Sequence, residues 1–197
     1  MSGCGHCLHP SSTSSEVGSL ARQEVERLRL HCSGPVEPGA PEMIVAMMIG
    51  ELRYQPELNS ITTQIVGTAV KVWQSFRSAT LVCEAAPMAS LASRLGVPTT
   101  HLAIAIPGSG GHTTRKVAEW LRARLALPSC GSLWVITHVL HADRARRILE
   151  RCRIQAACFG LDIPFPPRDL DWKLRSALRF RLYNLGAEVY CQSKGWL

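Results

Sequence analysis

A run of glycine, serine and threonine joins an apolar segment to an amphipathic one at Gly108-Ser109-Gly110-Gly111-His112-Thr113-Thr114. Glycines let the backbone turn tightly and approach a ligand, and the free amides at the start of a helix favour an anion. A threonine can cap the helix, and its hydroxyl can face the ligand. We therefore predict ligand contacts from Gly108, Ser109, Gly110, Gly111, Thr113 and Thr114. The alternative is an ordinary loop before a capped helix, because the run matches neither a Walker loop nor the dinucleotide fingerprint.

A second segment whose residues could take part in catalysis or binding is Thr137-His138-Val139-Leu140-His141. Arg144 follows it three residues later. An imidazole can transfer a proton near neutral pH, so His138 and His141 are candidate catalytic residues. Arg144 can hold a phosphate or carboxylate in a bidentate grip, and Thr137 can contact the same ligand. The alternative is that His138 caps the strand and that Asp143 and Arg147 form an i,i+4 surface pair.

Alternating apolar and amphipathic stretches must position these residues. The predicted strands cover 43–49, 79–83, 101–106, 133–137 and 154–159, and the predicted helices cover 60–76, 87–95, 113–125, 142–152 and 174–190. Gly96 is expected to end the second of these helices as its C-cap. Strands that are apolar throughout and separated by helices indicate a parallel sheet covered on both faces. The expected fold is α/β, a three-layer Rossmann-like sandwich with a mostly parallel sheet of about five strands.

In such folds ligands bind beyond the carboxyl ends of the strands, near the point where the strand order reverses. Gly50 follows the first predicted strand and is assigned to the ligand site. Glu84 follows the second strand and is a candidate for proton transfer.

The chain has 197 residues, enough for one domain with a core. Residues 1–41 read as a flexible arm with a short helix at 19–30 and a Pro/Gly linker, and 42–197 as the Rossmann-like domain. The N-terminal end of this arm contains Cys4, Cys7 and His9. These residues could bind zinc, and the simpler interpretation is a disordered end. We assign no metal ligand.

Hydrophobic residues make up 46% of the chain and charged residues 19%, as in globular proteins. The longest apolar runs are far shorter than the roughly 20 residues that span a bilayer, and no secretory signal is evident before residue 40. We therefore expect a soluble, cytoplasmic protein. The eight cysteines are then expected to be thiols, with Cys83 and Cys158 in the core.

The formal net charge is +7. This excess is either a solvated basic face or an attraction for an anionic partner. Only 6% of the residues are aromatic, which is few for a surface that stacks bases. The composition therefore favours a small anionic or nucleotide-like ligand over nucleic acid.

The segment Val135-Ile136-Thr137-His138-Val139-Leu140-His141-Ala142-Asp143-Arg144-Ala145 resembles the signature of the SanA/YdcF/ElyC-like domain of unknown function, in which His-x-x-Arg-Ala opens a helix after a strand. An apolar strand that ends at Gly50 and the segment Leu95-Gly96-Val97-Pro98 agree in order. The resemblance would cover about residues 43–190. It implies a Rossmann-like enzyme whose general reaction is not established, with S-adenosylmethionine binding in the YdcF type.

The chain departs from that family at its acidic positions. It has Ile106-Pro107 where the family has a glutamate before the loop, and Thr113-Thr114-Arg115-Lys116 where the family has Thr-x-Glu-Asn. It also has Cys83-Glu84-Ala85-Ala86 where the family has Ser-Gly-Gly. A step that depends on the acids is therefore lost or rebuilt with Glu51 or Glu84. We expect an enzyme of this type that acts on a small anionic or nucleotide-like ligand. The alternatives are a catalytically inactive binding or assembly module and, less favoured, an RNA-binding protein. Substrate, reaction, cofactor and oligomeric state do not follow from the sequence.

Overall fold

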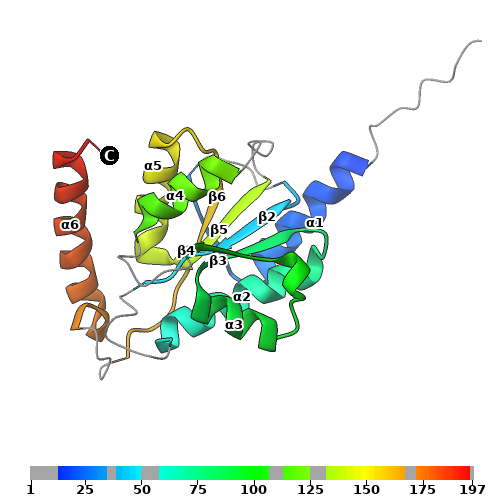
Figure 1. Cartoon of the computed structure of the whole chain (residues 1–197), viewed down its shortest axis with the longest axis horizontal. Helices are drawn as coiled ribbons and strands as arrows, with labels where there is room; N and C mark the ends of the chain where they lie inside the picture. The colour runs from blue at the N-terminus through cyan, green and yellow to red at the C-terminus, as the bar shows by residue number, and fades with distance from the viewer. Residues whose placement is uncertain are drawn as a thin grey trace, which may run out of the picture.

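A six-stranded sheet forms the centre of the molecule (Figure 1). The structure is a computed structural model and describes residues 13–34, 39–49, 58–106, 113–124, 132–166 and 172–195. The strands are β1 (His31–Ser33), β2 (Met43–Ala46), β3 (Thr80–Ala85), β4 (Leu102–Ile106), β5 (Leu133–His138) and β6 (Ala157–Leu161). Their order is β1-β6-β5-β2-β3-β4, and β1 alone among these pairs antiparallel to its neighbour.

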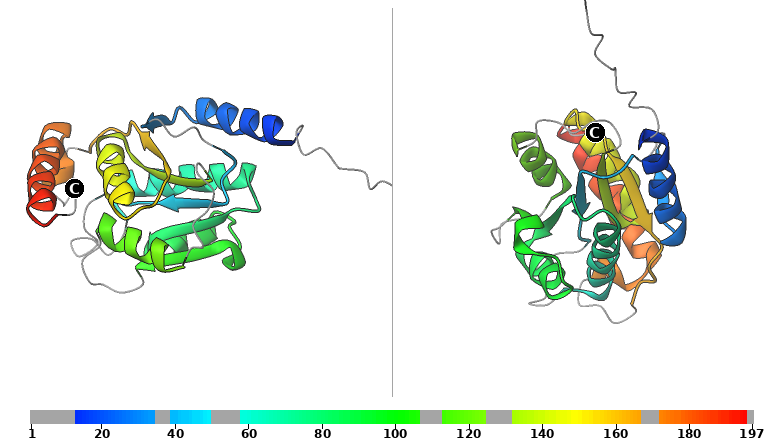
Figure 2. Two further views of the ribbon diagram at one scale, coloured as in Figure 1. Left: turned by 90° about the horizontal axis from the view of Figure 1, so that it is seen from above. Right: turned by 90° about the vertical axis from the view of Figure 1, so that its right-hand side faces the viewer.

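Helices cover both faces of the sheet (Figure 2). They are α1 (Thr13–Arg27), α2 (Ser60–Ser75), α3 (Ala86–Arg94), α4 (Thr114–Arg124), α5 (Val139–Arg151) and α6 (Ala177–Ser193). The core beneath α1, α2 and α3 and the core beneath α4 and α5 lie on opposite faces. The predicted α/β, Rossmann-like sandwich is confirmed. No helix within the described ranges is long and apolar enough to cross a lipid bilayer.

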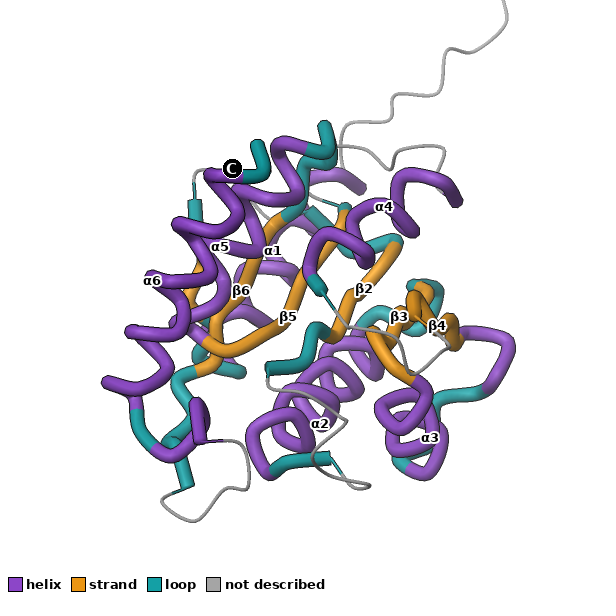
Figure 3. The backbone as a smooth tube through the Cα atoms, turned by 60° about the vertical axis from the view of Figure 1, so that its left-hand side comes forward, coloured by secondary structure: helices purple, strands orange, loops and turns teal. Residues whose placement is uncertain are grey.

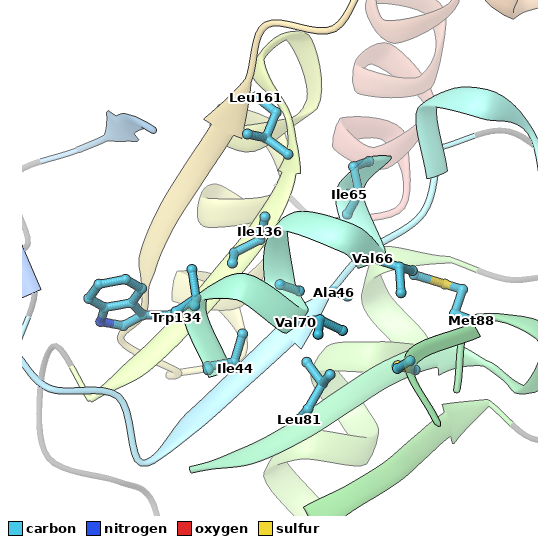
Figure 4. Close-up of a cluster of buried hydrophobic side chains, with 14 of the residues drawn as sticks. Ile44, Ala46, Ile65, Val66, Val70, Leu81, Met88, Trp134, Ile136 and Leu161 are labelled. Atoms are coloured by element: carbon cyan, nitrogen blue, oxygen red, sulfur yellow. The ribbon is translucent and has the colours of Figure 1, made fainter. Parts of the chain in front are cut away.

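Alternate residues of the same strands enter the two cores. Ile44 and Ala46 of β2 face α2, whereas Val45 faces the other helical layer (Figure 4). This is why the strands read as unbroken apolar runs. Trp134 of β5 is fully buried and lies 4.7 Å, centroid to centroid, from the ring of Phe159 in β6. The predicted core thiols Cys83 and Cys158 are both buried and free.

The order of the parallel strands creates a crevice beside β2. From β2 the chain moves outward through β3 and β4, and then returns to the opposite side of β2 with β5 and β6. This is the strand order of doubly wound nucleotide-binding sheets, in which the crossovers diverge beyond the carboxyl ends of the two central strands. The space beyond β2 and β5 is therefore where a ligand site is expected.

Helix α6 lies outside the two helical layers, at one end of the sheet (Figures 1 and 2), and runs beside α5 (Figure 3). Its Phe180 belongs to the core beneath α2, and its Cys191 belongs to the core beneath α4 and α5. The side-chain amide of Asn184 donates to the carbonyl oxygen of Leu140 at 2.8 Å. Arg147 of α5 and Glu188 of α6 form an ion pair. Through these contacts α6 bridges both cores across the carboxyl edge of the sheet.

Several boundaries differ from the sequence-based expectations. Helix α1 begins at Thr13 instead of residue 19, and α5 begins at Val139 instead of residue 142. Strand β1 lies where the expected helix gives way to the Pro/Gly linker, because a three-residue edge strand carries no apolar pattern. The predicted C-cap glycine, Gly96, does adopt the left-handed conformation, with φ +95°.

Candidate functional site

A cavity of about 210 Å³ lies beyond the carboxyl ends of the parallel strands. Five residues that the sequence assigned to a site line it: Glu84, Thr113, Thr114, His141 and Arg144. They come from β3, from the start of α4 and from α5. Helix α6 forms the facing wall of the cavity.

Arg144 brings a positive charge into the cavity, and no carboxylate of the described residues forms an ion pair with it. Its Nη2 donates to Nδ1 of His141 at 3.0 Å, and its guanidinium carbon lies 5.8 Å from the centre of the Tyr183 ring. Its Nη1 is buried and has no hydrogen-bond partner among the described residues. Burial lowers the pKa of Arg144, because the protonated guanidinium loses solvation there, and Tyr183, Cys191 and Glu188 oppose this in part. Over the same ranges no carboxylate lies within ion-pair distance of it.

The other arginines of the first turns of α5 are paired, in contrast to Arg144. Arg146 contacts Asp143 at 2.8 Å and Glu150 at 2.6 Å. Arg147 contacts Asp143 at 3.1 Å, which is the surface pair that the sequence offered as the alternative to a ligand site. Asp143 thus pairs with Arg146 and Arg147 on the outer side of the helix, whereas Arg144, on the inner side, has no carboxylate partner within the described residues.

The His141 imidazole links Arg144 to α4. Because a guanidinium can only donate, Nδ1 of His141 is the acceptor and Nε2 carries the proton. Nε2 lies 3.2 Å from the hydroxyl oxygen of Thr114 and donates to it. Burial, followed by the positive charge of Arg144, holds the pKa of His141 well below its ordinary 6.5, so the ring is neutral at physiological pH. The hydroxyl proton of Thr114 remains available for another acceptor.

Glu84 is the acidic residue on the described lining of the cavity. Its side chain is buried, and one carboxylate oxygen accepts the backbone N–H of Met48 at 3.0 Å. Burial raises the pKa of Glu84 to about 7, and the hydrogen bond from Met48 opposes this in part. Glu84 therefore gains and loses a proton near neutral pH.

Thr113, Thr114 and Arg115, at the start of α4, line the same cavity. The hydroxyl of Thr113 accepts the backbone N–H of Lys116 at 3.2 Å, so the expected cap of this helix is present. Arg115 points toward solvent in part and pairs with Glu119 at 2.7 Å. Helix starts of this kind favour negative charge.

His138 lies apart from the cavity. Its Nδ1 accepts the backbone N–H of Leu140 at 3.1 Å, and its Nε2 donates to the carbonyl oxygen of Ile163 at 2.9 Å. Burial lowers the pKa of His138, so the ring is a neutral cap of α5 whose two nitrogens are both occupied. Thr137 is also buried, does not line the cavity, and has no partner for its hydroxyl oxygen among the described residues.

The position of α5 depends on a glycine in β6. A Cβ atom on Gly160 would lie 2.5 Å from Cα of Val139, the first residue of α5. The absence of a side chain therefore lets the start of α5 approach the sheet, which places His141 and Arg144 at the cavity.

The remaining predicted residues lie outside the described residues. These are Gly50, Gly108, Ser109, Gly110, Gly111, Glu51, Cys4, Cys7 and His9. Within the part of the chain that is described, no three His, Cys, Asp or Glu side chains gather as a metal ion would require.

Sequence reasoning missed the contribution of α6. Tyr183, Tyr190 and Cys191 line the cavity opposite Arg144 and Glu84. Their spacing alone gave no signal, because α6 is apolar on two sides and therefore has no single apolar face.

Comparison of the chain with protein-family models, curated proteins and solved structures finds no match in any of the three. The resemblance to the SanA/YdcF/ElyC-like domain thus stays a prediction from the sequence motif.

Proposed function

We propose that this protein binds a small anionic ligand, one that carries a phosphate or carboxylate group, in the cavity beyond β2 and β5, and that Glu84 exchanges a proton with it. The protein would then be an enzyme of the general kind that the sequence led us to expect. The observation that carries the proposal is the buried guanidinium of Arg144, whose Nη1 lacks a partner within the described residues.

A buried charge without a counter-ion destabilises a fold, and its retention is explained when a ligand supplies the opposite charge. Three groups suit an anion here: the guanidinium of Arg144, the hydroxyl of Thr114 and the start of α4. His141 positions the first two, because it accepts from Arg144 and donates to Thr114. The arrangement supplies charge and directed donors to the same small volume.

The size of the cavity favours a small ligand. Sites for drug-sized molecules usually measure roughly 300–1,000 Å³, and this one measures about 210 Å³. A phosphate or a short phosphorylated or carboxylated metabolite suits that volume better than S-adenosylmethionine, which the resemblance implied. The positive sulfonium of that cofactor would also enter a cavity that already holds Arg144, which has no ion-pair partner among the described residues.

Glu84 replaces the histidines as the proposed proton-transfer residue. A general acid or base works best when its pKa lies near the working pH, and the pKa of Glu84 is about 7. His138 and His141 are engaged at both ring nitrogens, so neither is free to take a proton from a ligand.

A second candidate is a binding module without turnover. It is favoured by the same engagement of both histidines, which leaves Glu84 as the one acid–base group on the described lining whose pKa lies near neutrality. The two candidates share the anion site and differ only in whether Glu84 reacts.

The test is calorimetric titration of the full chain with inorganic phosphate and with pyrophosphate, with chloride as the control anion. Arg144→Met should weaken binding by about 1.5–3 kcal/mol, which is roughly 10- to 150-fold. Arg151→Met is the matched control, because this arginine is exposed at the other end of α5 and does not line the cavity. Absence of binding to the parent chain, or equal binding by the two variants, would refute the anion site.

Turnover is tested separately. Small molecules that co-purify with the native chain are identified by mass spectrometry and then offered as substrates to the parent and to Glu84→Gln. Conversion by the parent that falls about 100-fold or more in the variant supports the enzyme. Binding of the molecule without conversion supports the module.

A further inference from the structure

Helix α6 carries an apolar stripe on the side that faces away from the domain. Four side chains form it, with exposed fractions of 59–67%: Leu178, Leu182, Leu185 and Val189. We call this set the α6 stripe. Its members are spaced four, three and four residues apart, which places them on one face of the helix. Most other exposed large hydrophobic residues in the described ranges are scattered singly.

The opposite side of α6 is already occupied. Phe180 and Cys191 are buried in the two cores, and Tyr183 and Ala187 line the cavity. A helix that is apolar on both sides is normally buried on both sides. The α6 stripe is therefore a surface that lacks its cover within the described structure, and Figure 3 shows α6 at the periphery, with no described element on its outer side.

The spacing of the stripe is that of alternating a and d positions in a coiled coil. Such a seam fits a second copy of itself, because the same residues supply both knobs and holes. Gly186 lies beside the seam, and a Cβ atom there would meet nothing within 4 Å, so no contact inside the described structure requires this glycine in mid-helix. A small residue beside the seam lets two backbones approach closely.

The charges that flank the stripe decide whether two copies of α6 pack parallel or antiparallel. Arg181 and Glu188 occupy the same heptad position, immediately before Leu182 and Val189. If two copies of α6 run antiparallel with Leu182 of one copy against Leu185 of the other, Arg181 of each copy faces Glu188 of the other. In a parallel pair Arg181 would face Gly186. Arg181 has no ion-pair partner in the described part of its own chain, and the ion pair of Glu188 with Arg147 uses one of the two carboxylate oxygens of Glu188.

We infer that the protein forms a two-fold symmetric dimer through antiparallel packing of the α6 stripes. A two-fold axis brings the same patch of each copy together, so the pair between Arg181 and Glu188 forms twice in the dimer. This inference is independent of the proposed function, because the stripe and the cavity lie on opposite sides of α6.

Sedimentation of the full chain over a range of concentrations tests the dimer. The parent should sediment as a dimer, and Leu182→Glu combined with Leu185→Glu should raise the dissociation constant roughly 100-fold or more. Both side chains are exposed, so the double variant should keep the circular dichroism and melting temperature of the parent monomer. A parent that stays monomeric at its highest attainable concentration would overturn the inference.

Charge reversal tests whether the two α6 helices pack antiparallel. Arg181→Glu should weaken the dimer roughly 5- to 30-fold, because two attractive pairs become repulsive. Arg179→Glu is the matched control, since the antiparallel arrangement places this position opposite Gly186. Equal effects of the two variants would overturn the antiparallel arrangement. A monomeric parent that binds vesicles of phosphatidylcholine and phosphatidylserine would instead assign the stripe to a membrane surface.

Discussion

Replacing Glu84 by glutamine should remove a pH dependence of folding stability that the buried carboxyl creates. Glutamine keeps the shape of the side chain, and its amide oxygen can still accept the backbone N–H of Met48. It cannot ionise. The parent and the variant therefore differ in one respect, which is the free energy of placing a carboxylate in this buried position.

The size of the effect follows from the pKa. Burial raises the pKa of Glu84 from 4.5 to about 7 in the folded protein. Between these two values the folded state holds a proton that the unfolded chain has released, so the free energy of unfolding falls as pH rises through this window. Above the folded pKa the loss is complete and amounts to about 3 kcal/mol.

The assay is denaturant unfolding of parent and variant between pH 4 and pH 8.5. The two proteins should be about equally stable near pH 4, and Glu84→Gln should be more stable by about 3 kcal/mol near pH 8. Glu119→Gln is the control, because this carboxyl is exposed on α4 and should give a difference below about 1 kcal/mol at every pH. A difference that does not vary with pH would refute the raised pKa. A difference of the opposite sign would mean that Glu84 is ionised and paired, which would also supply the counter-ion that Arg144 lacks among the described residues.

Further predictions concern the supports of the site. Gly160→Ala should lower the free energy of unfolding by about 1–3 kcal/mol, because α5 must move away from β6. Gly67→Ala, in open space on α2, should instead raise the free energy of unfolding by about 0.5–1 kcal/mol. Denaturant unfolding of the two variants measures both changes. His141→Ala should weaken phosphate binding roughly 2- to 10-fold in calorimetry, because Arg144 loses its acceptor. Deleting residues 1–12 should leave the melting temperature and, by elemental analysis, the metal content unchanged; one zinc per chain, lost on truncation, would contradict this.

The parallel sheet was predictable because each central strand is buried on both faces. Val45 and Ile44 point to opposite cores, so the run around them is apolar throughout and stands out in the sequence. The cavity could be predicted in part for the same reason, because residues after the strands converge at one edge. Glu84, Thr114 and Arg144 do lie together.

The chemistry of the two histidines could not be read from the sequence. His138 and His141 are three residues apart, yet one is bound to the carbonyl of Ile163 beyond β6 and the other to Thr114 on α4. These partners are distant in the chain, and they fix which nitrogen carries the proton. Local spacing places an imidazole near a site, whereas its protonation and its freedom to react depend on long-range packing.

The short antiparallel strand β1 has a consequence for aggregation. Strand β6 is fully buried along its five residues and has β5 on one side. Without β1 the other edge of this apolar strand would offer a row of unpaired backbone N–H and C=O groups, which is a template for pairing with other chains. β1 covers this edge with His31, Cys32 and Ser33, three residues with exposed or half-buried side chains, and is itself too short to recruit a further strand. The segment that reads in sequence as the approach to a linker thus serves to keep the sheet from growing from one molecule into the next.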